Sequence, residues 1–483
     1  MNMATIVLLI FGVIGILGLG GNGALSIALI SFLPSVVCLL PLAVHQPRKV
    51  FLIYNPLVYA TIFFFGTQVI TPAMTLMFAP DSPALMPWLL WDPVPQIRAA
   101  IVMSLIAALG LVAGYLSPIG RFLARKFLRN TFSGANVDSE LVVLILLVSG
   151  LALQMLAFTI GAYGFNLHVG VFGATVFAFA RIKDIATVAW WMCIFRRQKF
   201  SLWRILLGLM PLALDIAVGG NKGAMFNWFV LMLAAHQFVR RVYIRRVLSW
   251  VLVSICVVIV GFVYGTEWRT VKTAEYGRAS VISLSSTAGV HMTAVNNLLS
   301  RPLAESLRHP MELVGVRASG VTSLGVILAR KTELESMERM IGIDETIFQY
   351  AVLSFVPRFL WREKPVLDLL EQVGRLYFGT YQTSPALTVM GDLYRHGRTV
   401  AVLLGMATIG IFLRTSYEWM LLKPERIPLR SGIYVSFLLL INWEASFSGI
   451  FPALLRHIFV VFLVSVFIRL FLVHARKEGT THD

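Results

Sequence analysis

The chain has 483 residues, of which 58% are hydrophobic and only 13% are charged, and its mean hydropathy is +0.79. About a quarter of the residues of a soluble protein are charged, so this composition excludes a soluble enzyme and indicates an integral membrane protein. A net charge of +17 would suggest a nucleic-acid partner in a soluble protein, but here the bases gather in short loops, where they report orientation. Cys38, Cys193 and Cys256 lie inside apolar runs, with neither disulfide nor zinc spacing.

Apolar runs that approach or exceed the length needed to cross a bilayer recur along the chain. The first of them has no basic region before it and no obvious cleavage site, so we expect a retained helix and not a signal peptide. We predict twelve spans, near residues 4–20, 23–43, 54–79, 98–117, 140–162, 169–195, 203–218, 223–239, 247–265, 399–416, 430–442 and 450–473.

Lys and Arg alternate between the two sides of these predicted spans. The segment from Pro80 to Gln96 has two aspartates and no base, whereas the loops on the other side are strongly basic. The positive-inside rule therefore predicts that both termini are cytoplasmic. The basic groups are Arg48 and Lys49, Arg121 to Arg129, Arg196 to Arg204, Arg240 to Arg246, Lys423 to Arg430, and Arg476 with Lys477.

One predicted outer loop, residues 266–397, is far longer than the others. It carries fourteen Lys or Arg and thirteen Asp or Glu, and long loops cross the membrane regardless of charge. Amphipathic periodicity near 303–316 and 366–378 predicts helices within it, so we expect a small domain. The predicted organisation is nine spans over 1–265, the loop domain over 266–397, and three spans with a cytoplasmic tail over 398–483.

Ionisable residues inside predicted spans are costly and indicate function. Arg181, Lys183 and Asp184 lie within the sixth span, which we expect to be kinked or interrupted near Arg181. Arg181 and Asp184 are one helical turn apart and can pair, so a broken helix with an internal salt bridge is the alternative to a functional site. Further polar residues lie near the outer ends of other spans, namely Asp215, Glu444, Arg456 and His457.

The most polar stretch of the chain runs from Gln349 to Arg398. Two prolines, Pro357 and Pro365, bracket a run of aromatic and basic residues that includes Arg358, Trp361 and Lys364. Farther on, Asp392 and His396 are four residues apart, so a helix would place both on one face. Cations suit a phosphate-bearing ligand, and a carboxylate with an imidazole suits proton transfer, although ordinary surface charge is the simpler explanation.

Two other features add cations at the predicted outer level. A glycine-rich turn, Gly219 to Gly223, carries Lys222 at the start of a helix, an arrangement that can bind anions. Arg269 follows the ninth span by about one turn, where it can also snorkel to lipid phosphate.

Taken together, these motifs resemble the O-antigen and exopolysaccharide polymerases of bacteria, the Wzy-type family. The matching residues are Gly219 to Gly223, Arg269, Pro357 to Pro365, and Gly391 to Gly397. The architecture is similar over about residues 200–460 and the sharp motifs over about fifty residues. This sequence departs from the family in having Lys222 where many relatives carry Arg, and Asp392 where Glu is common.

The resemblance implies an all-α polytopic membrane protein, GT-C-like, with about twelve spans and one large periplasmic loop domain. It implies a metal-independent glycosyltransferase of the bacterial inner membrane without a cofactor, whose substrate is an oligosaccharide on undecaprenyl pyrophosphate. Expected partners are membrane lipids, a flippase and a chain-length regulator, and no nucleic acid. The expected roles are base for Asp392, His396 or Glu444, pyrophosphate binding for Lys222, Arg269, Arg358, Lys364 and Arg398, and sugar stacking for Trp361 and Tyr394.

Two other functions stay open from the sequence. A glycan ligase would use the same lipid-linked donor with a different acceptor. An ion-coupled transporter or flippase would use twelve spans and the charges near Arg181, although no internal repeat relates the two halves.

Overall fold

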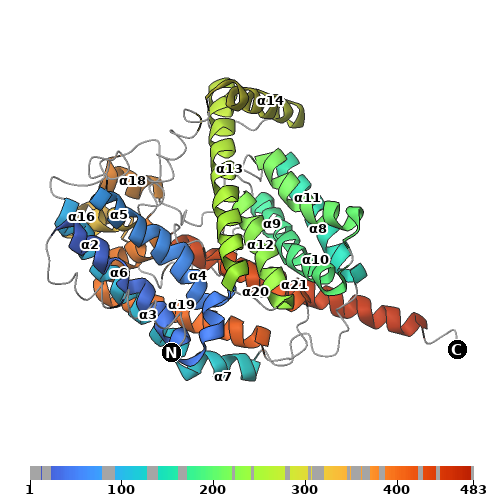
Figure 1. Cartoon of the computed structure of the whole chain (residues 1–483), viewed down its shortest axis with the longest axis horizontal. Coiled ribbons are helices and arrows are strands. Elements are labelled where there is room, and N and C mark those ends of the chain that lie inside the picture. The colour runs from blue at the N-terminus through green and yellow to red at the C-terminus, as the bar shows by residue number, and fades with distance from the viewer. Residues whose placement is uncertain are drawn as a thin grey trace. The chain divides into compact units, whose positions relative to one another are not determined.

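The computed structural model describes most of the chain, and every regular element in the described part is a helix (Figure 1). This confirms the all-α prediction. The described residues are 23–78, 93–127, 140–160, 171–198, 200–219, 224–240, 244–277, 283–302, 320–344, 370–379, 387–421, 428–441 and 446–479, with Gly12, Ser306, Gln349 and Trp361.

Six helical segments of the described residues are long and apolar enough to cross a membrane. Each coincides with a predicted span, so the protein is a helical membrane protein, while a total of twelve spans stays a prediction. The segments are Ala24–His45 (α2, Ala24–Ile30, and α3, Leu33–His45), Pro56–Phe78 (α4, Pro56–Ala60; η2, Thr61–Ile70; α5, Thr71–Phe78), Val94–Leu116 in α6 (Pro93–Leu116), Glu140–Thr159 (α8), Thr388–Met420 in α19 (Thr388–Leu421) and Phe447–Val466 in α21 (Phe447–Gly479).

The other described elements are also helical, as predicted, but their bounds differ from those of the predicted spans. Two shorter apolar helices match predicted spans, namely α12 (Ala224–Val239) and α20 (Pro428–Leu440). The predicted interruption of the sixth span is confirmed, because α9 (Val171–Ala180) ends and α10 (Ile182–Arg197) begins on either side of Arg181. The remaining elements are η1 (Pro47–Phe51), α7 (Pro118–Phe127), α11 (Leu202–Gly219), α13 (Ile244–Tyr276), α14 (Leu284–Ser300), α16 (Gly320–Met340) and α18 (Leu370–Phe378).

Both predicted boundaries of the long loop fall on helices. Helix α13 continues past residue 265 to Tyr276. Helix α19 begins before the predicted boundary at 397, but its backbone leaves helical geometry at Gly397 and Arg398, so a kink separates a short first segment from the span. The motif from Gly391 to His396 is therefore helical.

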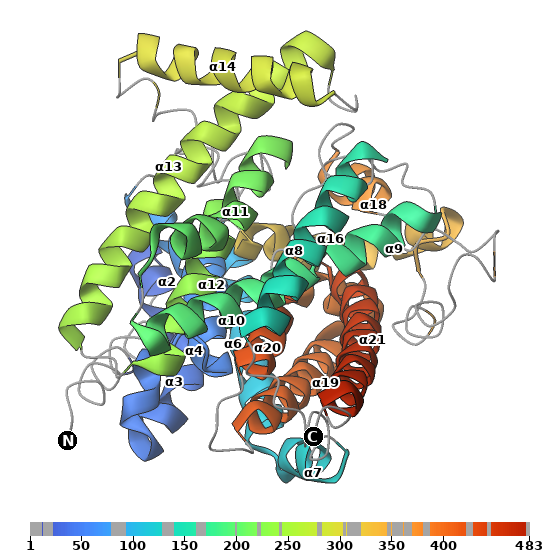
Figure 2. The same cartoon turned by 90° about the vertical axis from the view of Figure 1, so that its right-hand side faces the viewer.

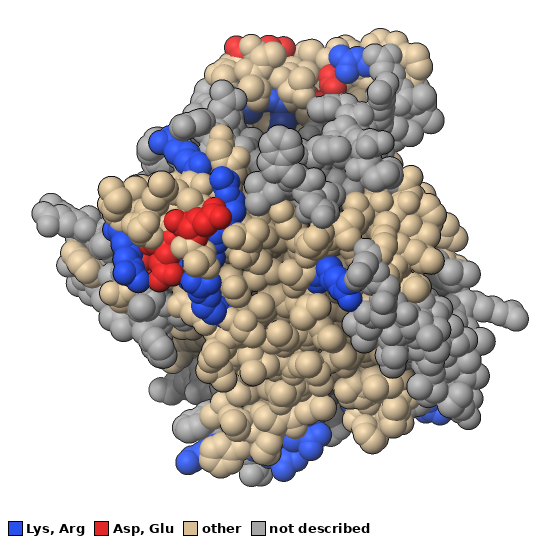
Figure 3. All heavy atoms as spheres, turned by 90° about the vertical axis from the view of Figure 1, so that its left-hand side faces the viewer, with Lys and Arg blue, Asp and Glu red and all other residues tan. Residues whose placement is uncertain are grey.

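The chain divides into two compact units. Unit 1 comprises the described residues within 1–127, 312–419 and 440–455, and unit 2 those within 128–311, 420–439 and 456–483. Within unit 1, α16 and α18 lie at one end and α7 lies at the other (Figures 1 and 2). On the face shown in Figure 3, one mixed patch of acids and bases borders a broad surface that is largely without charge.

Helix α19 is positioned in unit 1 by a glycine-lined crossing with α6. A Cβ added at Gly114 would lie 2.0 Å from the carbonyl oxygen of Ala407, and one at Gly110 would lie 2.5 Å from that of Leu403. The reverse contact is equally close, because a Cβ at Gly410 would lie 2.2 Å from the carbonyl oxygen of Leu111. Small residues let membrane helices approach backbone to backbone, so these glycines fix where α19 lies.

We expect Gly114→Ala to destabilise the protein by about 1–3 kcal/mol, because the new methyl group must push α6 and α19 apart. Gly289→Ala is the matched control, since Gly289 lies in α14 with no heavy atom within 4 Å of an added Cβ. That control is expected to raise stability by about 0.4–1 kcal/mol. Thermal unfolding of the two purified variants measures both changes in stability. Equal unfolding midpoints for Gly114→Ala and Gly289→Ala would contradict the close approach of α6 to α19.

Candidate functional site

The short first segment of α19, Thr388 to His396, carries the acid and the imidazole of the candidate site. Its glycine permits close packing, because a Cβ at Gly391 would lie 2.7 Å from Cδ1 of Ile327 on α16. Non-glycine residues with positive φ stand at both ends, Thr388 at 57° and Arg398 at 58°. Such backbone costs roughly 1–3 kcal/mol and gathers at functional sites, so the strain marks this segment as a candidate.

The carboxylate of Asp392 is buried and contacts three other groups. Its side chain is almost fully buried, and Oδ2 accepts a hydrogen bond from the backbone N–H of Ser448 at 2.9 Å. Oδ1 lies 3.4 Å from a guanidinium nitrogen of Arg395 and 3.4 Å from Nε2 of His396. This confirms that helical spacing brings Asp392 and His396 together. A fixed carboxylate of this kind orients an imidazole and stabilises its protonated form.

Arg395 joins this acid to a second buried acid, Glu338 of α16. The Nε atom of Arg395 donates to Oε1 of Glu338 at 2.8 Å, and one terminal nitrogen donates to the carbonyl oxygen of Ile343 at 2.9 Å. Lys331 pairs with the other oxygen of Glu338. The charges of Lys331 and Arg395 cancel those of Glu338 and Asp392, as burial of charge requires.

Tyr377 of α18 completes this network, whose members we call the Glu338 network: Lys331, Glu338, Tyr377, Asp392 and Arg395. The Tyr377 hydroxyl donates to Oε1 of Glu338 at 2.9 Å, and the ring faces the Arg395 guanidinium at 5.9 Å. Burial, followed by the charge of Glu338, raises the pKa of Tyr377 above its ordinary value, so the hydroxyl stays a donor. The network thus ties α16, α18, α19 and the start of α21 together.

Two other expected site residues lie beside this network. Arg398 donates to Thr332 Oγ1 and to Glu335 Oε2, both at 3.1 Å, and its side chain is 43% exposed. Its guanidinium lies 6.0 Å from the ring centre of Tyr394. Lys331, followed by other nearby cations, lowers the pKa of Glu335, so this acid is ionised beside Arg398.

Arg269 belongs to unit 2, on the part of α13 beyond the predicted span. Lys272 follows one helical turn later, and burial together with the charge of Arg269 lowers the pKa of Lys272. The nearby acid, Glu267, is engaged by Asn297 at 2.8 Å and Arg301 at 3.2 Å of the following segment. Arg269 and Lys272 therefore form a local concentration of positive charge on α13.

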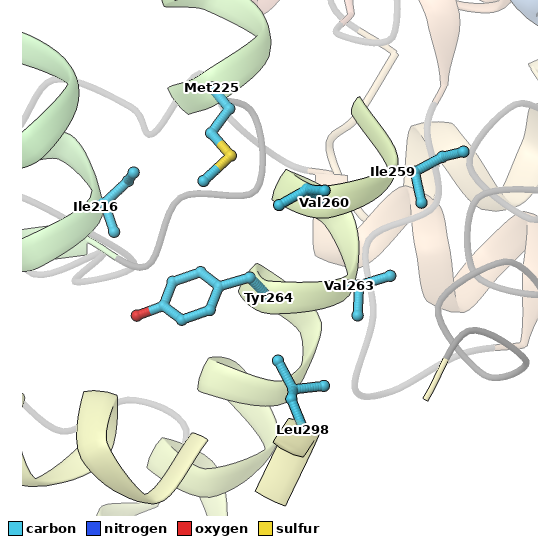
Figure 4. Close-up of a pocket in the computed structure, with 7 residues that line it drawn as sticks. All are labelled: Ile216, Met225, Ile259, Val260, Val263, Tyr264 and Leu298. Atoms are coloured by element: carbon cyan, nitrogen blue, oxygen red, sulfur yellow. The ribbon is translucent and has the colours of Figure 1, made fainter. Parts of the chain in front are cut away.

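Unit 2 also contains an apolar pocket of about 480 Å³, formed by α11, α12, α13 and α14. Figure 4 shows Met225 above the ring of Tyr264, with Ile216 beside it and Leu298 below. The Tyr264 hydroxyl contacts Nδ1 of His291, whose Nε2 lies 3.0 Å from the carbonyl oxygen of Ala217. A lining without polar surface suits a hydrocarbon chain.

A buried ionic cluster lies inside unit 2, at the break between α9 and α10. Lys183, 4% exposed, lies 2.6 Å from Oδ2 of Asp215 and 3.7 Å from Asp184. Gln154 donates to the other oxygen of Asp215 at 2.7 Å, and Arg181 pairs with Asp184 at 3.3 Å. The expected salt bridge of Arg181 with Asp184 is therefore present, and Asp215 joins it.

Of the expected site residues, the structure brings Asp392, Tyr394, His396 and Arg398 together on α19. Trp361 is 41% exposed. Lys222, Arg358, Lys364 and Glu444 lie outside the described residues. In the part of the chain that the structure describes, no group of three or more His, Cys, Asp or Glu is placed to hold a metal ion.

Sequence reasoning missed the acid at the centre of the network. The stretch from Glu333 to Met340 is a charged segment of the sequence, and its residue Glu338 is fully buried in the structure. The available signal was spacing, because Lys331 and Glu338 are seven residues apart and so share one helical face. His291 was also missed, and no pattern around it marks a site. Comparison with known proteins finds no matching family model, no similar curated protein and no similar solved structure.

We expect Glu338→Gln to lower the free energy of unfolding by about 3–5 kcal/mol, because Lys331 and Arg395 would then share too little negative charge in a buried site. Glu335→Gln, one turn away on the exposed face of α16, is the matched control and is expected to leave the unfolding midpoint unchanged. Thermal unfolding of both purified variants is the measurement. Similar midpoints for the two would show that the Glu338 network does not stabilise the fold.

Proposed function

We propose that the protein is a polysaccharide polymerase of the bacterial inner membrane. In this proposal it transfers a growing glycan from undecaprenyl pyrophosphate to a new lipid-linked repeat unit on the periplasmic face. The observation that carries the proposal is the buried Asp392–His396 pair, 3.4 Å apart and fixed by Ser448 and Arg395. This pair occurs within the motif from Gly391 to Gly397 on which the family resemblance depends.

The pair suits activation of an acceptor hydroxyl. Nε2 of His396 lies 3.4 Å from Oδ1 of Asp392, and in this proposal Nε2 carries the proton while Nδ1 is the basic nitrogen. As the acceptor oxygen bonds to the sugar carbon, its proton passes to His396 and the bond to the pyrophosphate oxygen breaks. The imidazolium is stabilised by Asp392, which acts as a positioning residue, and the leaving pyrophosphate takes the electron pair.

Charge develops on the leaving pyrophosphate, so the proposal needs cations aimed at it. Unit 2, taken by itself, carries two neighbouring positive charges on α13, Arg269 and Lys272. The apolar pocket includes Val263 and Tyr264 of the same helix, so unit 2 offers both a cationic and a hydrocarbon surface. This combination supports a lipid-linked donor. Arg358 and Lys222 are proposed from the sequence to add to these cations.

The direct test is glycan analysis after deletion of the gene. The proposal expects single lipid-linked repeat units in place of polymer, restored to polymer by the wild-type gene. Unchanged polymer would exclude this function. Polymer that is made but stays on its lipid carrier would instead indicate the ligase.

Arg358→Lys is expected to reduce polymer nearly as much as Arg358→Ala, by about 10²–10³ in rate, because an ammonium cannot bind two phosphate oxygens as a guanidinium does. His396→Ala should also abolish polymer, and Asp392→Asn should weaken it by misorienting the imidazole. Polymer length at matched protein levels is the readout, with Arg339→Lys as an exposed control. Wild-type polymer from Arg358→Ala would contradict a catalytic role for the stretch from Gln349 to Arg398.

Ion-coupled transport is the second candidate, favoured by the cluster of Lys183, Asp184 and Asp215 at a broken helix. If the protein is a polymerase, Asp215→Asn should leave polymer length unchanged at matched protein levels, because Lys183 keeps Asp184 as a partner. If it is an ion-coupled transporter, the same variant should stop transport. Loss of the polymer in cells that carry correctly inserted Asp215→Asn protein would therefore favour transport.

A further inference from the structure

One end of unit 1 holds more positive charge than its acids neutralise. Arg414 of α19 pairs with Glu418, and Arg121 of α7 lies 3.4 Å from the same carboxylate. Lys49 of η1 lies 5.8 Å from the ring centre of Tyr417. These three cations and one acid, which we call the Arg414 cluster, carry a net charge of +2 among the described residues.

The cations of the Arg414 cluster are close enough to repel one another. Burial, followed by the charge of Arg414, lowers the pKa of the half-buried Lys49, and Arg121 acts in the same direction. Arg414 is itself buried against Tyr115, and within the described residues its Nε donor has no acceptor. An anion at this place would relieve the repulsion and accept hydrogen bonds.

Helix α7 sits beside this cluster and has three faces. Gly120 and Ala124 are buried, and a Cβ at Gly120 would lie 2.7 Å from Cβ of Arg414, so this face packs against α19. The opposite surface carries Ile119 and Phe122, 48% and 57% exposed. The exposed cations Arg121 and Arg125 lie between these two surfaces. Lys126 is also exposed, with its Nζ atom 5.3 Å from the ring centre of Phe122, and α7 contains no acid.

We propose that this end of unit 1 binds the headgroup of an anionic phospholipid. The cations of the Arg414 cluster contact its phosphate, and Ile119 and Phe122 lie against its acyl chains. Cationic amphipathic helices bind membrane surfaces by this combination of charge and apolar contact. The occupant is a lipid and not soluble phosphate, because α7 directly follows the candidate span Val94–Leu116 and exposes two large apolar side chains. Figure 2 shows α7 at the end of the α6–α19 pair.

The test measures the thermal unfolding midpoint of the purified full-length protein in detergent against added phosphatidylglycerol or phosphatidylcholine. Phosphatidylglycerol should raise the midpoint of the wild type more than phosphatidylcholine does. Lys49→Gln should require about fivefold more phosphatidylglycerol for the same shift, since one basic residue near a lipid surface contributes about 1 kcal/mol. Lys49 is the position of choice because it makes no ion pair shorter than 4.0 Å with any described acid, so its loss leaves Glu418 paired.

Two control variants test whether the response depends on the positive charge at position 49 and on the position of that charge in the protein. Lys49→Arg should keep the wild-type response, and Arg339→Gln, which removes an exposed cation from α16, should also keep it. Equal effects of the two lipids on the wild type would overturn the proposal. So would a wild-type response from Lys49→Gln, or inorganic phosphate alone producing the whole shift.

Discussion

The buried guanidinium of Arg395 is the constraint on which unit 1 depends. A charge taken out of water in a protein interior must be paired and hydrogen-bonded, and Arg395 meets that need with Glu338, Asp392 and the carbonyl oxygen of Ile343. Its partners come from α16, from the segment after α16 and from α19 itself. Satisfying one guanidinium therefore fixes the relative positions of those segments, and Tyr377 and Ser448 add α18 and α21.

The same constraint bears on chemistry. Because Asp392 is engaged by Arg395 and by the Ser448 N–H, it is better suited to orient His396 than to take a proton from a substrate. The backbone strain at Thr388 and Arg398 flanks the segment that these contacts hold in place. Structure and proposed mechanism thus draw on one set of interactions, in which the positioning residues also stabilise the fold.

Local pattern predicted the six candidate spans of the described residues, because apolar length is a local property of the sequence. It also predicted the break at Arg181, from the cost of charges inside an apolar span, and the proximity of Asp392 to His396, from helical spacing. It could not predict the contact of Glu338 with Arg395, which joins residues 57 apart, or the approach of α6 to α19 through Gly114. The predicted end of the ninth span, residue 265, is not the end of α13, which continues to Tyr276. Hydropathy falls there while the helix continues, and periodicity identifies the apolar face of a helix and not its last residue.

The measurement that tests the proposed function most directly is polymerisation by the purified protein in vesicles that contain only lipid-linked single repeat units. The account predicts a ladder of glycan lengths, with one polyprenyl pyrophosphate released for each new glycosidic bond and no requirement for a nucleotide sugar. Release of the pyrophosphate without a ladder, or no reaction from folded and correctly inserted protein, would contradict it.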